Sequence, residues 1–71
     1  MKVVLKVRFG TTKEKFEKFS ENNYLVYVPL EQDNDSAKVL EGIISKKLGV
    51  PSNRVVFAGL DMNKNWVFEV M

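Results

Sequence analysis

Two residue types that carry much of enzyme chemistry are missing from this chain of 71 residues, which has no cysteine and no histidine. Without cysteine there is no thiol nucleophile, no disulfide and no thiolate ligand for zinc. Without histidine the chain also lacks the usual general base and the commonest metal ligand. We therefore expect no catalytic residues, no metal site and no cofactor, and a function other than that of an enzyme.

Long apolar runs are missing as well. The first apolar stretch ends at Lys6, so the N-terminal residues do not resemble a signal peptide. No segment approaches the ~20 apolar residues that cross a bilayer. Because the absence of cysteine also fits a reducing compartment, we expect a soluble cytoplasmic protein with no membrane partner.

The residues that are present fit one small globular domain over residues 1–71. Hydrophobic residues make up 45% of the chain, too many for a disordered segment. The net charge is +2, but residues 1–20 hold six cations and two carboxylates, whereas residues 21–45 hold one cation and five carboxylates. This excess is smaller than that of a dedicated nucleic-acid-binding domain, and it is concentrated at the N-terminal end.

Apolar and polar residues alternate strictly over residues 2–9, which predicts a half-buried strand. The same pattern predicts strands over residues 24–30 and 66–71, and an apolar stretch before Gly59 predicts a strand over residues 54–58. Residues 12–19 are ambiguous, because the spacing of their aromatic residues suits a helical turn. The turn-forming residues that follow suit a hairpin instead, and we favour a short strand there.

A single helix is predicted over about residues 36–48 by apolar residues at helical spacing. Asp35 or Ser36 offers a side-chain oxygen as N-cap, and Gly49 can adopt the left-handed conformation that ends a helix. Gly42 in the middle costs about 1 kcal/mol relative to alanine. We expect a close approach of the helix to a sheet as the compensation.

These elements predict a two-layer α+β fold, in which one main helix lies on one face of a mixed sheet of four or five strands. The element order is β-(β)-β-α-β-β. Since one helix covers only one face of a sheet, the alternation divides the strand residues into two sets. The set expected beneath the helix is Val3, Leu5, Val7, Val26, Val28, Phe57 and Phe68. The set expected on the other face is Val4, Leu25, Tyr27, Val56 and Val67, among Lys2, Lys6, Arg8 and Glu69.

From residue 24 to residue 70 the order of features resembles the YggU-like family of small uncharacterised proteins. The matching stretches are Val26-Tyr27-Val28-Pro29, Ala37 at the helix start, Lys46-Lys47-Leu48-Gly49-Val50-Pro51, Val55-Val56-Phe57 and Gly59. The polar motifs of the family are mostly replaced here, by Asp35-Ser36-Ala37-Lys38 and Met62-Asn63-Lys64-Asn65. The resemblance implies the fold of that family and no assigned activity. Residues 49–59 are also similar to the middle of ubiquitin, which implies a β-grasp fold as an alternative.

Three surfaces are candidates for function. Lys2, Lys6 and Arg8 beside Tyr27 combine charge with an aromatic platform, as single-strand binding requires, although a lysine row also simply protects an edge strand. Lys38 and Lys64 suggest an anion site where the helix start meets the turn at residues 60–65. The acids nearby oppose that site, and they offer a metal only a weak ligand pattern; they are Glu31, Asp33 and Asp35.

The third surface is the apolar set on the uncovered face, which favours a protein partner or a homodimer because uncovered apolar patches mark interfaces. Its residues are Val4, Leu25, Tyr27, Val56 and Val67. Scattered apolar residues are also normal on any protein surface. We therefore predict a small non-enzymatic binding or interaction domain, with single-stranded nucleic-acid binding as the alternative.

Overall fold

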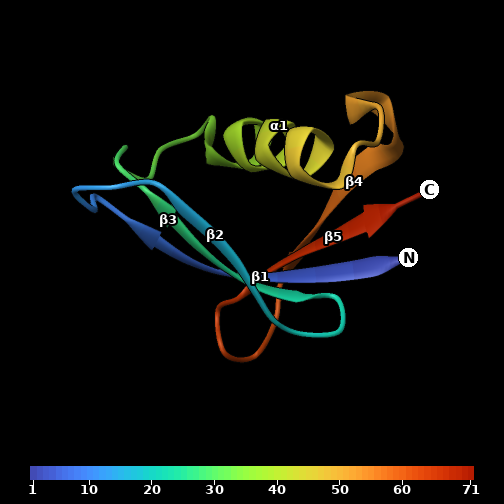
Figure 1. Cartoon of the computed structure of the whole chain (residues 1–71), viewed down its shortest axis with the longest axis horizontal. Helices are drawn as coiled ribbons and strands as arrows, with labels where there is room; N and C mark the ends of the chain where they lie inside the picture. The colour runs from blue at the N-terminus through green and yellow to red at the C-terminus, as the bar shows by residue number, and fades with distance from the viewer.

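The computed structural model describes all residues 1–71 and contains one five-stranded sheet with a single α-helix on one face (Figure 1). The elements in chain order are β1 (Lys2–Phe9), β2 (Lys15–Ser20), β3 (Asn23–Val28), α1 (Ser36–Leu48), the 3-10 helix η1 (Ser52–Arg54), β4 (Val55–Leu60) and β5 (Trp66–Val70). The expected α+β fold is confirmed, and the ambiguous stretch contributes a strand. Neither helix has the length and apolar character needed to cross a bilayer.

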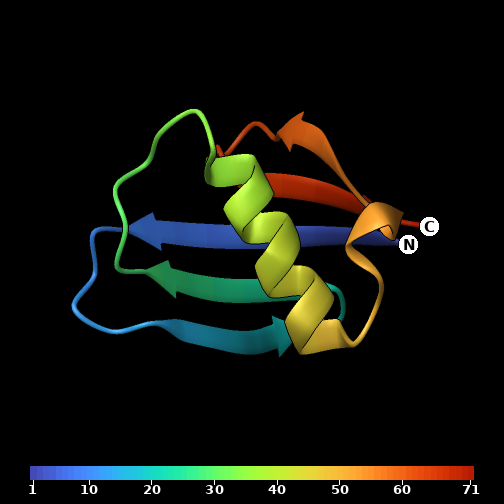
Figure 2. The ribbon, with the colours of Figure 1, turned by 90° about the horizontal axis from the view of Figure 1, so that it is seen from above.

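The strands lie side by side in the order β2-β3-β1-β5-β4, which differs from their order along the chain (Figure 2). β1 and β3 are parallel, and the other three neighbouring pairs are antiparallel. The chain therefore leaves β1, forms the edge strand β2, and returns as β3 between the two. β2 and β4 are the two edges of the sheet.

Helix α1 runs diagonally across the sheet and covers its apolar face (Figure 2). The largest fully buried side chains come from three strands and the helix: Phe68, Leu5, Leu40, Ile44, Val3 and Val26. The set expected beneath the helix is confirmed, with Val7 and Phe57 partly buried against the core and the other five buried. Alternation sorted these residues because successive strand side chains point to opposite faces.

The two ends of α1 differ in how well the sequence predicted them. Gly49 has a φ of 69° and ends the helix in the left-handed conformation, and the amides of Gly49 and Val50 both donate to the Ser45 carbonyl. The expected side-chain N-cap is wrong, because Asp35 makes no such bond. The hydroxyl of the buried Ser36 instead accepts a hydrogen bond from the Asp33 amide at 2.8 Å.

Gly42 does not bring the helix closer to the sheet, so that expectation is also wrong. The residue is exposed, and a Cβ built on it would meet no atom within 4 Å. Gly42 therefore lies on the solvent side of α1, where nothing in the packing requires a glycine.

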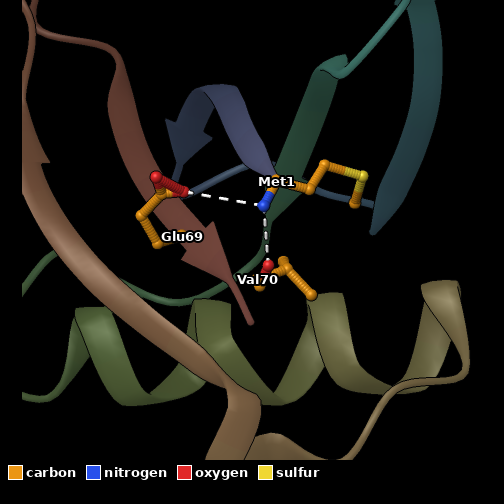
Figure 3. Close-up of polar contacts among 3 residues, drawn as sticks. All are labelled: Met1, Glu69 and Val70. Atoms are coloured by element: carbon orange, nitrogen blue, oxygen red, sulfur yellow. Dashed lines mark hydrogen bonds and ion pairs between the residues drawn. The ribbon is translucent and has the colours of Figure 1, made fainter.

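The start of β1 is tied to the end of β5 by backbone and charge (Figure 3). The Met1 amine donates to the Val70 carbonyl at 2.8 Å and lies 3.9 Å from the Glu69 carboxylate. The Val70 amide donates to the Met1 carbonyl at 2.7 Å. These contacts fix the register of β1 and β5 where β1 begins and β5 ends.

Candidate functional site

The face of the sheet opposite α1 carries no covering element (Figure 1). Strand pairing arranges its side chains in rows that cross several strands. The structure places all the apolar residues predicted for this face on it, together with three of the predicted cations: Val4, Leu25, Tyr27, Val56 and Val67, with Lys2, Lys6 and Arg8. We call this surface the open face.

The most basic row of the open face is centred on Tyr27. Arg8 of β1 is paired with Tyr27 of β3, and Lys15 of β2 is paired with Tyr27 from the other side. The aromatic ring therefore has a cation as its neighbour on each flanking strand. Lys15 Nζ lies 5.5 Å from the centre of the Tyr27 ring, which is within the range of a cation–π contact.

Charge is more balanced in the rows further along the strands. Next to the Tyr27 row, Leu25 is paired with Lys6 on one side and with Glu17 on the other. At the far end, Lys2 of β1 is paired with Glu69 of β5. The unbalanced positive charge of the open face is therefore concentrated at the end of the sheet that holds Tyr27.

Lys15 is held in place by an ion pair within its own strand. Its Nζ lies 3.0 Å from the Glu17 carboxylate, and the hydrogen bond and charge of Glu17 raise the pKa of Lys15. Lys15 is thus a firmly cationic group beside Tyr27, although Glu17 offsets part of its charge. Arg8 makes no ion pair and is exposed, so its guanidinium is free to meet a ligand.

A hollow of about 500 Å³ opens beside Tyr27, between the ring and the loop that joins β1 to β2. Its lining residues are Thr11, Thr12, Lys13, Glu14, Lys15 and Tyr27. This volume lies within the ~300–1,000 Å³ that is usual for small-molecule sites. The aromatic wall and the hydroxyl groups suit a planar ligand, and the two lysines of the lining outnumber its single carboxylate, Glu14.

Lys38 and Lys64 are not brought together. Lys38 is on α1, whereas Lys64 is in the β4–β5 turn, which bends away from the helix on the other side of the sheet (Figure 1). The turn is closed by Asp61, whose carboxylate accepts the amides of Asn63 and Asn65 at 2.9 Å each. The proposed meeting of the helix start with this turn does not occur.

A second hollow of about 310 Å³ lies between the start of α1 and the ends of β1 and β3. Its floor includes Phe9 and Val28, and its rim carries Glu31, Asp33 and Asp35. These acids would repel an anion at the helix start. Across the chain, no group of three or more acidic, cysteine or histidine side chains gathers closely enough to hold a metal ion.

Lys15 is the one member of the Tyr27 row that sequence analysis did not single out. It lies in the stretch whose secondary structure was ambiguous. As a strand, that stretch places Lys15 and Glu17 on one face by period two. The sequence contained that signal, but only the pairing of β2 with β3 shows that this face is the open one.

Comparisons with other proteins do not add to this picture. No protein-family model, curated protein or solved structure matches the chain. The resemblance to the YggU-like family therefore stays a prediction, and the case for a function rests on the geometry of the open face.

Proposed function

We propose that this chain is a non-enzymatic cytoplasmic binding domain whose open face binds single-stranded nucleic acid. The observation that carries the proposal is the row in which Arg8 and Lys15 flank Tyr27 on the two neighbouring strands. Single-strand binding sites combine aromatic rings, on which bases stack, with cations that follow the phosphate backbone. Tyr27 supplies the ring, and the two cations lie on both sides of it.

The partial burial of Tyr27 favours stacking on its ring. Neighbouring side chains on three strands restrict the ring before a ligand arrives, so less side-chain entropy is lost on binding. The hollow beside the ring has room for a base, and Lys13 and Lys15 on its lining are placed to meet a phosphate. A duplex keeps its bases stacked inside and gains less from this site than a single strand does.

The apolar residues of the open face argue less strongly for a protein partner. Val4, Leu25 and Val67 are only half-exposed. Val4 and Val67 are cross-strand partners, but Leu25 is flanked by Lys6 and Glu17, so the three form no broad apolar patch of the kind that marks an interface. Val56 is more exposed, but it lies on the edge strand far from Tyr27.

The proposal is tested by titrating a labelled single-stranded oligonucleotide, as DNA and as RNA, and measuring its fluorescence anisotropy at low and moderate salt. Tyr27→Ala is expected to weaken binding about 5- to 150-fold, because stacking on one aromatic ring contributes about 1–3 kcal/mol. Arg8→Ala is expected to reduce the slope of log K against log salt by about 0.7, the value for one phosphate contact on a single strand.

Lys38→Ala is the matched control for Arg8→Ala, because it removes an exposed cation from the helix side of the molecule. It is expected to bind as tightly as the wild type. The proposal is wrong if the wild type shows no binding at low salt, or if Lys38→Ala and Arg8→Ala reduce binding equally. Circular dichroism of each variant checks that the sheet is intact.

A further inference from the structure

The hollow between the start of α1 and the ends of β1 and β3 adjoins a third hollow, of about 340 Å³, further along the helix. Val28, Leu30 and Val39 line both of these hollows. The diagonal course of α1 leaves the ends of β1 and β3 uncovered there, beside the loop that joins β3 to α1 (Figure 2). The two hollows therefore form one groove on the helix side of the sheet, which we call the helix groove.

The inner surface of the helix groove is apolar. Phe9 and the buried Val28 contribute its floor, and Val39 and Ile43 of α1 contribute one wall. Leu30 borders both hollows and is 56% exposed. A ligand that covers this leucine and enters the hollows removes apolar surface from water, which favours binding.

The loop beside the helix groove is bonded to its neighbours at both ends. The Gly10 amide, which follows β1, donates to the Leu30 carbonyl at 2.8 Å. At the other end, the Asp33 amide donates to the hydroxyl of Ser36, the first residue of α1, at 2.8 Å. Because these bonds form without a ligand, the groove is preformed, and less ordering entropy is lost on binding.

Every charged side chain that lines the helix groove is acidic. These side chains are Glu14, Glu31, Asp33 and Asp35. None of them makes an ion pair, since the two ion pairs of the chain involve other residues. The chain as a whole carries 11 cations and 9 carboxylates, so the groove has a local charge opposite to that of the chain. Charge complementarity therefore selects a cationic occupant with an apolar part.

The spacing of the two hollows favours a peptide over a small organic cation. Ser36 lines only the first hollow, Ile43 lines only the second, and Val39 lines both. The hollows thus follow one another along α1 by about one turn, or ~5.4 Å. Alternate side chains of an extended peptide lie about 6.6 Å apart on one face. Two such apolar side chains can fill both hollows, while flexible basic side chains between them reach the carboxylates.

We propose that the helix groove binds a basic peptide segment of a partner protein, which inserts two apolar side chains beside α1 and pairs its cations with the surrounding acids. The proposal does not depend on the nucleic-acid site, which lies on the other face of the sheet. The acids of the groove repel phosphate, so the two faces take ligands of opposite charge. Glu14 borders both sites and is therefore left unchanged in the tests.

A fluorescently labelled hexapeptide of alternating leucine and lysine tests the proposal, with anisotropy at low salt as the measurement. Two peptides of the same length are the controls. One alternates leucine with glutamate, and the other alternates serine with lysine. The leucine–lysine peptide is expected to bind with a dissociation constant below about 1 mM. Each control peptide lacks one of the two required features and is expected to bind at least about 10-fold more weakly.

Two pairs of variants test the groove itself. Leu30→Ala is expected to raise the dissociation constant of the leucine–lysine peptide about 3- to 10-fold, because it removes apolar contact area. Leu60→Ala is its matched control, since Leu60 is 52% exposed on β4, away from the groove. Glu31→Lys reverses a charge of the groove and is expected to raise the constant by at least about 3-fold. Glu21→Lys is its control, an exposed acid in the β2–β3 turn.

Backbone amide chemical shifts in NMR spectra locate the bound peptide, and the largest changes are expected in residues 28–36 and 39–43. Shifts centred on the open face overturn the proposal, as does a leucine–lysine peptide that fails to bind at about 1 mM. Equal binding of either control peptide, or equal effects of Leu30→Ala and Leu60→Ala, also overturns it. Tyr27→Ala is expected to bind the peptide as the wild type does, which separates this proposal from the nucleic-acid site. Thermal melts show that each variant is folded before it is scored.

Discussion

The two faces of the sheet are built from the same alternating strands but have different surroundings. On the covered face, strand side chains pack against α1 and form the only extensive core of the domain. On the open face, rows of charged and half-exposed residues cross the strands. In so small a domain the core has little reserve, so stability depends mainly on the packing of the covered face.

The largest effect is expected from a matched pair of substitutions in β1. Val3 is fully buried beneath the helix, whereas Val4 is half-exposed on the open face. Val3→Ala is expected to destabilise the domain by about 2–3 kcal/mol, through lost burial and a cavity. Val4→Ala is expected to cost about 1 kcal/mol or less, because its surroundings already include water. Urea denaturation followed by circular dichroism measures both.

Equal losses of stability in Val3→Ala and Val4→Ala would contradict the difference between the two faces of the sheet. Such a result would mean that both faces of β1 are equally packed. Oligonucleotide binding adds an independent reading. Val3→Ala, where it is still folded, should bind as the wild type does, because Val3 does not reach the open face.

A smaller effect with the opposite sign is expected on the solvent side of α1. Gly42→Ala is expected to stabilise the domain by about 1 kcal/mol, because alanine is the better helix former and its Cβ meets no atom within 4 Å. Gly49→Ala is the control, since its φ of 69° strains any residue with a Cβ; it is expected to destabilise the domain by about 1 kcal/mol. Loss of stability in Gly42→Ala would show a contact on that side of the helix.

The smallest effect concerns the turn below the open face and depends on pH. The amide of Asn65, followed by that of Asn63, donates to the Asp61 carboxylate and lowers its pKa below the ordinary 3.8, with a further contribution from the charge of Lys2. A carboxyl whose pKa is lower in the folded state stabilises the fold above its unfolded pKa. That stabilisation is lost as the pH falls through the folded value.

Asp61→Asn keeps one acceptor oxygen and removes the charge. We expect the variant to melt at a lower temperature than the wild type at pH 7, and the difference to shrink as the pH is lowered below 3.8. Melting curves from pH 7 down to about pH 2 measure the difference. Glu21→Gln, an exposed acid in another turn, should show no such trend; a constant difference for Asp61→Asn would contradict the explanation.

The helix and the faces of the strands were predictable because their signals are local. Apolar residues at helical spacing and Gly49 predicted the bounds of α1, and alternation in β1, β3 and β5 separated the covered set from the open one. The errors also have local causes. The Ser36 hydroxyl accepts a hydrogen bond from the preceding loop instead of capping the helix. Gly42 was expected to let the helix approach the sheet, but no atom lies close to the position of a Cβ there.

The sequence by itself determined the helix, four of the five strands, the faces to which their side chains point, and the lack of cysteine and histidine. Only the tertiary structure decided the strand order, the parallel pairing of β1 with β3, and the position of β2 and β4 at the edges. Side chains alternate between the two faces of a strand whichever strand lies next to it. Alternation therefore cannot predict which strands are neighbours in the sheet. For that reason the row of Arg8, Tyr27 and Lys15 exists only in the folded sheet.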